Sequence, residues 1–62
     1  MSLTERERAI LRLRAEGLSD YRIAQRLRSY PVNVSRSRKS ALRKLEDARV
    51  DLEFAKEIGV GK

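Results

Sequence analysis

SDYRIAQRLRSYPVNV, which spans residues 19–34, predicts a short helix, a tight turn and the start of another helix. Ser19 is a good N-cap residue, because its hydroxyl can accept a bond from the first turn of a helix. Three apolar residues follow at helical spacing, namely Ile23, Ala24 and Leu27. Pro31 suits the first position of the next helix, where its missing N–H costs nothing. This order of elements is typical of a helix-turn-helix.

A further helix is predicted before this stretch. Thr4 and Glu7 form a capping box, in which each side chain bonds the backbone N–H of the other residue. Gly17 supplies a left-handed stop at the end of this helix. Apolar residues of all three helices are spaced to form one core that braces the third helix: Ile10, Leu13, Leu18, Ile23, Ala24, Leu27 and Val34.

The third helix is expected to be long, because neither glycine nor proline occurs from Val32 to Ile58. A single helix of this length would reach about 40 Å at about 1.5 Å per residue, whereas a break near residue 46 is the alternative. The predicted fold class is all-α, with a three-helix helix-turn-helix core and a long C-terminal helix. We expect residues 1–46 to form the helix-turn-helix domain and residues 47–62 to form a helical extension.

One stripe of the third helix follows a heptad pattern, with steps of four, three, four and three residues. Its members are Ala41, Leu45, Ala48, Leu52 and Ala55. The stripe could fold back on the core, or it could pair with a second copy of the chain. It is longer than a short bundle can cover, and charged residues flank it, so we predict that these residues form the seam of a homodimer.

Charge points to a polyanionic partner, since the net charge is +6 on 62 residues. Residues 1–44 hold 12 Lys/Arg against four Asp/Glu, whereas residues 45–62 hold three against five. Arginine supplies 11 of the 15 cationic residues, and its planar fork suits phosphate oxygens and guanine edges. A basic chain with the layout of a helix-turn-helix therefore predicts a double-stranded DNA-binding transcription regulator.

The start of the third helix supplies the predicted base readers. If Val34 points inward, then Val32, Asn33 and Arg36 lie toward the opposite side of the helix. Asparagine can bind adenine edges, arginine can bind guanine edges, and valine can contact the methyl group of thymine. Other residues of the turn and of both helices are predicted to contact phosphate: Arg22, Arg26, Arg28, Ser29, Tyr30, Ser35, Lys39 and Arg43.

Other functional classes are disfavoured by the composition. The chain has no histidine and no cysteine, so the usual zinc sites and disulfides are excluded. It also lacks a glycine-rich phosphate loop, and we expect no enzyme activity, cofactor, metal or small-molecule substrate. Neither a signal peptide nor a membrane span is recognisable, which predicts a cytoplasmic protein without a membrane partner. The alternative function is a helix-turn-helix-like module that docks on another transcription component.

The apolar and capping residues resemble the helix-turn-helix shared by LuxR-type regulators and sigma-factor region 4. The matching residues are Leu3-Thr4-Glu5-Arg6-Glu7, Ile10-Leu11, Leu13, Gly17-Leu18-Ser19, Ile23-Ala24, Leu27 and Val34. A closer resemblance is to the archaeal Tfx group, through Asn33-Val34-Ser35, the basic stretch and the tail from Glu46, over roughly residues 3–58. It implies an archaeal DNA-binding regulator with Asn33, Ser35 and Arg36 at the start of the reading helix. Arg28 stands where these turns often have glycine, and Tyr30-Pro31 replaces a serine cap, which predicts a differently shaped turn.

Overall fold

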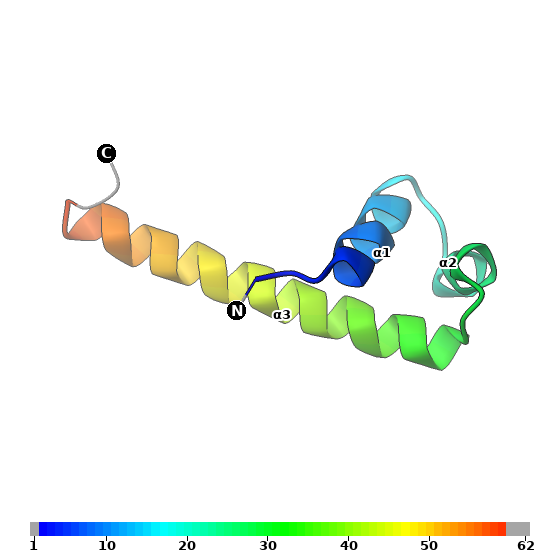
Figure 1. Cartoon of the computed structure of the whole chain (residues 1–62). Coiled ribbons are helices and arrows are strands. Elements are labelled where there is room, and N and C mark those ends of the chain that lie inside the picture. Colours follow the sequence, from blue (N-terminus) through cyan, green and yellow to red (C-terminus); the bar gives the residue numbers. More distant parts are fainter. Residues whose placement is uncertain (1, 60–62) are drawn as a thin grey trace.

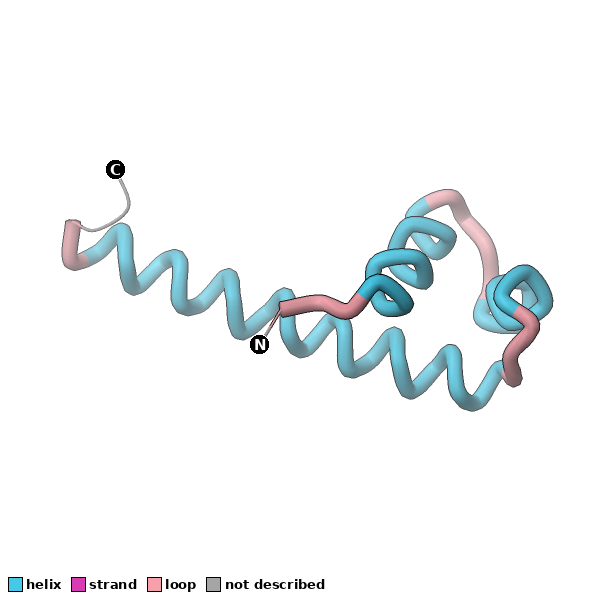
Figure 2. Tube along the Cα trace, viewed as in Figure 1, coloured by secondary structure: helices cyan, strands magenta, loops and turns pink. Residues whose placement is uncertain are grey.

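The computed structural model describes residues 2–59, which form three helices and no strand. Helix α1 spans Glu5–Ala15, α2 spans Asp20–Leu27 and α3 spans Pro31–Glu57. Helices α1 and α2 lie side by side over the first half of α3, and the second half of α3 projects beyond them (Figures 1 and 2). The Cα trace is elongated as a result, measuring 44 × 18 × 15 Å. The all-α fold with a long C-terminal helix is confirmed.

Both ends of α1 have the predicted caps. The Thr4 hydroxyl accepts a bond from the Glu7 N–H at 3.1 Å, and the Glu7 carboxylate accepts one from the Thr4 N–H at 2.8 Å. At the other end Gly17 has a φ of 97°, in the left-handed region that glycine tolerates. The N–H groups of Gly17 and Leu18 bond back to the carbonyls of Arg14 and Leu13. This pairing is a Schellman motif, and it directs the chain from α1 into α2.

The turn between α2 and α3 keeps a glycine-like conformation without a glycine. Arg28 itself is left-handed, with φ 55° and ψ 49°. The N–H of Ser29 bonds the Ala24 carbonyl at 2.8 Å, which closes α2 as the corresponding bond closes α1. The predicted change in the shape of the turn is therefore wrong at Arg28, which adopts the left-handed conformation that glycine would have. The cap of α3 does differ, since Tyr30 makes no side-chain capping bond.

The predicted core is confirmed in full. Four of its residues are buried and the other three are partly buried against them. The buried group comprises Ile10, Ile23, Ala24 and Val34, and the surrounding group comprises Leu13, Leu18 and Leu27. Each helix contributes to this cluster, so the core fixes α3 against α1 and α2.

Two ion pairs connect α3 to the earlier helices. Arg38 binds Asp20 at the start of α2, and Lys44 binds Glu7 in α1 at 2.9 Å. Neither pair was predicted from the sequence. Together with the core they unite residues 2–45 into one unit, which we call the head.

Helix α3 runs without a break, so the predicted continuous helix is confirmed and a break near residue 46 is excluded. Its residues 46–57, which we call the projecting half, are exposed except for Ala55, which is partly covered. Arg49 bonds Glu46 and Glu53 along this half, and such pairs support a helix that has few tertiary contacts. Ala41 corrects the predicted seam, because the head buries it completely and leaves it no surface for a second copy.

Candidate nucleic-acid interface

The first turns of α3 present the three predicted base readers to solvent. Val34 is completely buried, so it fixes which side of α3 faces the core. Val32, Asn33 and Arg36 are all exposed, and helical periodicity places them toward the opposite side. Among residues 2–59, the Arg36 guanidinium makes no hydrogen bond or ion pair. The structure thus leaves this side of α3 open to a ligand.

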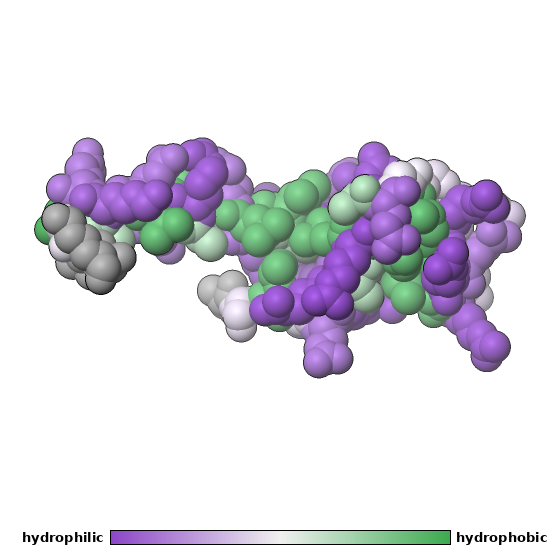
Figure 3. Space-filling view, turned by 90° about the horizontal axis from the view of Figure 1, so that it is seen from above, coloured by the Kyte–Doolittle hydropathy of each residue, from purple (hydrophilic) through white to green (hydrophobic). Residues whose placement is uncertain are grey.

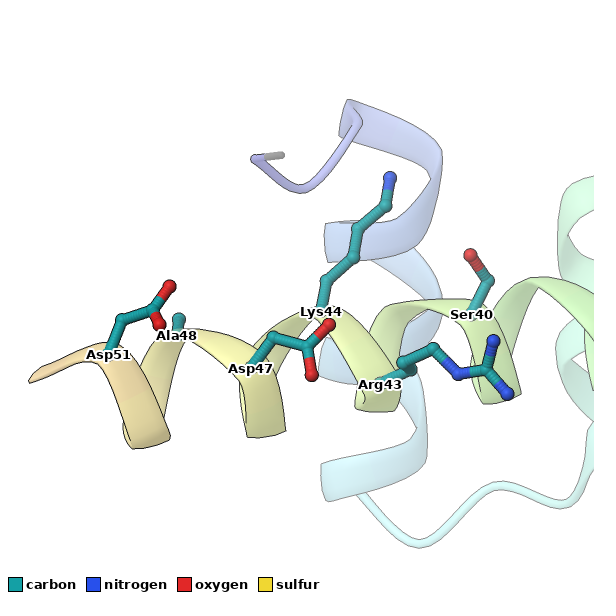
Figure 4. A pocket seen from close by; sticks show the side chains of 6 residues that line it. All are labelled: Ser40, Arg43, Lys44, Asp47, Ala48 and Asp51. Atoms are coloured by element: carbon teal, nitrogen blue, oxygen red, sulfur yellow. The ribbon is translucent and has the colours of Figure 1, made fainter. Parts of the chain in front are cut away.

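The same side of α3 stays basic for about two turns, from Arg36 to Arg43, and then changes sign. Lys39 and Arg43 are exposed and continue the line that begins at Arg36. An open depression beside Arg43 is also lined by Asp47 and Asp51 (Figure 4). Arg43 extends along α3 in that view, whereas Lys44 reaches up toward α1. The change from cations to carboxylates within one turn marks where a polyanion would cease to be attracted.

The other predicted phosphate contacts occupy two places. Arg22 and Arg26 line one shallow groove on the exposed side of α2, together with Leu18 and Gln25. Arg28 and Tyr30 are exposed in the turn before α3, and 73% of the Tyr30 residue is exposed. The predicted contacts thus lie on α2, on the turn and on α3, all within the head.

Two of the predicted phosphate residues are less available than the others. Ser29 and Ser35 are both partly buried. The Ser29 hydroxyl already accepts a hydrogen bond from Arg6 Nη2 at 2.9 Å. Arg6 of α1 therefore contacts the turn that precedes α3. The spacing of residues in the sequence does not reveal this contact.

The main omission from the sequence prediction is the pair formed by Asp20 and Arg38. Arg38 Nε and Nη2 donate to the two carboxylate oxygens of Asp20, both at 3.0 Å. The hydrogen bonds from the Arg38 guanidinium hold the pKa of Asp20 below its ordinary value, and the Asp20 carboxylate in turn raises the pKa of Arg38. A signal was present, because Arg38 lies seven residues before Leu45 and so continues the inner heptad stripe. A charge on the inner stripe requires a partner, although the heptad position does not identify which acidic residue supplies it.

Glu7 is the most buried charged residue of the described part of the chain, with 6% of the residue exposed. The bond from Lys44, followed by the bond from the Thr4 backbone, lowers its pKa from 4.5 to about 2. Its carboxylate therefore caps α1 and binds α3 at once. A structural role for Glu7 accounts for these contacts without any catalytic function.

Acid should destabilise the fold through Glu7. A carboxyl group with a lowered pKa in the folded state contributes stability that is present above its unfolded pKa and is lost as pH falls toward the folded one. We expect the midpoint temperature of thermal unfolding to decrease as the pH is lowered from 4.5 to about 2. Lys44→Met removes the main cause of the lowered pKa, so its midpoint should depend less on pH over that interval. Equal pH dependence in the two proteins, followed by circular dichroism, would contradict this role of Lys44.

Comparisons with known proteins agree with this geometry. The sequence profile of the bacterial regulatory proteins of the luxR family matches residues 1–50. The chain belongs to this family. It is also 36% identical over 56 residues to a protein named DNA-binding protein Tfx from Methanothermobacter thermautotrophicus. That alignment covers 90% of this chain and 41% of the relative, so the chain spans less than half of the relative's length. No solved structure gives a significant match.

The matched region contains the helix-turn-helix and its core. Residues 1–50 include α1, α2 and α3 as far as the beginning of the projecting half. The predicted resemblance to LuxR-type and Tfx-like helix-turn-helix proteins is thereby confirmed. Over residues 2–59, no helix is long and apolar enough for a membrane crossing, and no cluster of potential metal ligands is found.

Proposed function

We propose that this luxR-family chain is a cytoplasmic transcription regulator that reads double-stranded DNA by placing the start of α3 in the major groove. The observation that carries the proposal is the contrast between completely buried Val34 and its exposed neighbours Asn33 and Arg36. A major groove about 12 Å wide admits one helix, and its base edges differ for all four base pairs. The role is one of binding rather than catalysis.

Base recognition would be carried by three side chains of the first two turns. The Asn33 amide can bond the N6 and N7 atoms of adenine, and the Arg36 guanidinium can bond O6 and N7 of guanine. Val32, with 56% of its surface exposed, offers a methyl contact for thymine. Because all three belong to one rigid helix, they would be brought to successive bases together.

Phosphate contacts would hold α3 at the correct depth. Lys39 and Arg43 would follow one strand along α3, while Arg22 and Arg26 on α2 and the turn residues Arg28 and Tyr30 would hold the backbone nearby. Such contacts give affinity without selecting a sequence. Asp47 would repel a strand that continued along α3, so the DNA contact should end before the projecting half.

The experiment that tests the proposal is selection of bound duplexes from a random pool at physiological salt. A DNA reader should enrich one motif, and its affinity should fall steeply as salt increases because bound counterions are released. An interaction module for another protein should enrich none and should show little salt dependence on duplex DNA. Failure to enrich any motif would refute sequence-specific reading.

We also infer that the projecting half pairs with a second copy of the chain. Leu45 and Leu52 remain 44% and 55% exposed in the single chain, with Ala48 between them and Ala55 one turn further on. Viewed from the side that carries α1 and α2, apolar surface continues from the head onto α3 (Figure 3). Pairing along this stripe would cover surface that water otherwise solvates. Two joined heads would then read two half-sites.

A charge in the seam should dissociate the dimer. Leu52→Glu places like charges against each other across a two-fold interface, and the sedimentation coefficient should shift toward that of a monomer. Phe54→Glu is the matched control, because Phe54 is similarly exposed, at 59%, but lies on the other side of α3. Sedimentation velocity should show a change for Leu52→Glu only. A wild-type chain that sediments as a monomer at micromolar concentration would contradict the dimer.

A further inference from the structure

The two ion pairs of α3 flank its buried stripe. Val34 marks the direction of the core, and at 3.6 residues per turn Arg38 lies about 40° to one side of it, toward α2. Lys44 lies about 80° to the other side, toward α1. The helix is therefore held on both flanks, and a rotation about its own axis would disturb both pairs.

The contact between Asp20 and Arg38 defines an orientation as well as a distance. Two parallel N–H···O bonds of 3.0 Å align the guanidinium with the carboxylate. Both side chains are well covered, since only 20% of Arg38 and 25% of Asp20 remains exposed. Lys44, by comparison, binds Glu7 with one ammonium group, which behaves as a point charge with less directional preference.

The apolar contacts beneath α3 constrain its rotation less strongly. Its two completely buried residues are Val34 and Ala41, whose contacts with the earlier helices are apolar. Apolar contacts are non-directional, so they define the rotation of a helix less sharply than a bidentate polar contact does. A side-chain tip lies about 5–6 Å from the helix axis, so a rotation of about 20° moves it by about 2 Å. Productive polar contacts must be held to within about 0.5 Å.

We propose that Asp20 and Arg38 are positioning residues that set the rotation of α3 and thereby determine which bases Asn33 and Arg36 can reach. This inference rests on the proposed DNA-reading function. Arg38 lies on the inner side of α3 and is bound to α2, whereas Arg36, two residues earlier, faces outward. The charge of Arg38 is matched by Asp20, so this arginine contributes orientation rather than affinity for phosphate.

The test is the ratio of two affinities, for the duplex selected from the random pool and for a scrambled duplex of the same composition. Asp20→Asn and Arg38→Met both break the bidentate contact, but they change the net charge from +6 to +7 and to +5 respectively. If the pair positions α3, both variants should lower the ratio by about tenfold, and the double variant should lower it no further. If the pair acts only through charge, Asp20→Asn should tighten and Arg38→Met should weaken binding to both duplexes, with the ratio unchanged. That result would overturn the inference.

Circular dichroism checks that each variant has the helix content of the parent, at a temperature well below the unfolding midpoint of that variant. Arg38→Lys keeps the charge but loses the fork, so it should give an intermediate ratio, and it decides the question if Arg38→Met does not fold. A ratio equal to that of the parent in Arg38→Lys and Asp20→Asn would also overturn the inference. Failure of the proposed function would look different. The parent chain itself would then show no preference between the two duplexes.

Discussion

Ile23→Ala should leave the chain largely unfolded or close to its unfolding midpoint at room temperature. Ile23 is completely buried at the meeting point of the three helices, and truncating a buried isoleucine to alanine costs about 2–5 kcal/mol. A chain of this size has a free energy of unfolding of roughly 3–9 kcal/mol in total. The loss is therefore comparable with the whole stability, and thermal unfolding followed by circular dichroism measures it directly.

Ile58→Ala provides the matched control for this prediction. It makes the same chemical change just past the end of α3, where the residue is 58% exposed. Its effect on the free energy of unfolding should stay within about 0.5 kcal/mol, because substitutions at exposed sites remove little buried surface. Equal destabilisation by the two variants would mean that the cluster of the head is not the main source of stability.

The fold was predictable because its signals are local. Thr4 and Glu7 lie three residues apart, and Gly17 ends the helix that directly precedes it. The seven core residues recur at helical spacing. Each of these signals depends on residues within one or two helical turns, and the periodicity of a sequence indicates such local relations well. The uninterrupted length of α3 follows from the absence of glycine and proline between Val32 and Ile58.

The contacts between helices were not predictable in the same way. Arg38 reaches Asp20 across 18 residues, and Lys44 reaches Glu7 across 37. Such pairings depend on the angles at which the helices cross, which the packing of side chains determines and a periodic pattern does not contain. Ala41 shows the same limit, since its heptad position fits a seam or a core equally well. Only the packing of the earlier helices on α3 decides between the two.

Arg28 shows how a local rule can be overridden. A non-glycine residue in the left-handed region costs about 1–2 kcal/mol, so the sequence favours another turn shape. The structure retains the left-handed turn, closed by bonds from Arg28 and Ser29 to the end of α2. The conformation also delivers Pro31 to the start of α3 at the position where its ring fits. The placement of α3 is thus maintained at some local cost in backbone energy.

Arg36→Ala should have the largest effect on recognition. Removal of a bidentate contact to guanine costs about 1–3 kcal/mol on the preferred duplex and relaxes the preference at that base pair. Binding to scrambled DNA should weaken far less, because there the residue contributes one charge among many. Titration of both duplexes at one salt concentration, followed by fluorescence anisotropy, gives the two affinities.

Arg22→Ala separates base reading from simple loss of charge. Both substitutions remove one exposed arginine of the head, so the net charge changes equally, from +6 to +5. Arg22 belongs to α2, and its loss should weaken binding to every sequence alike and reduce the dependence on salt. The comparison therefore isolates the contribution of position on α3. If Arg36→Ala weakened the selected and the scrambled duplex by the same factor, Arg36 would be a phosphate contact, and base reading would have to come from other residues of α3.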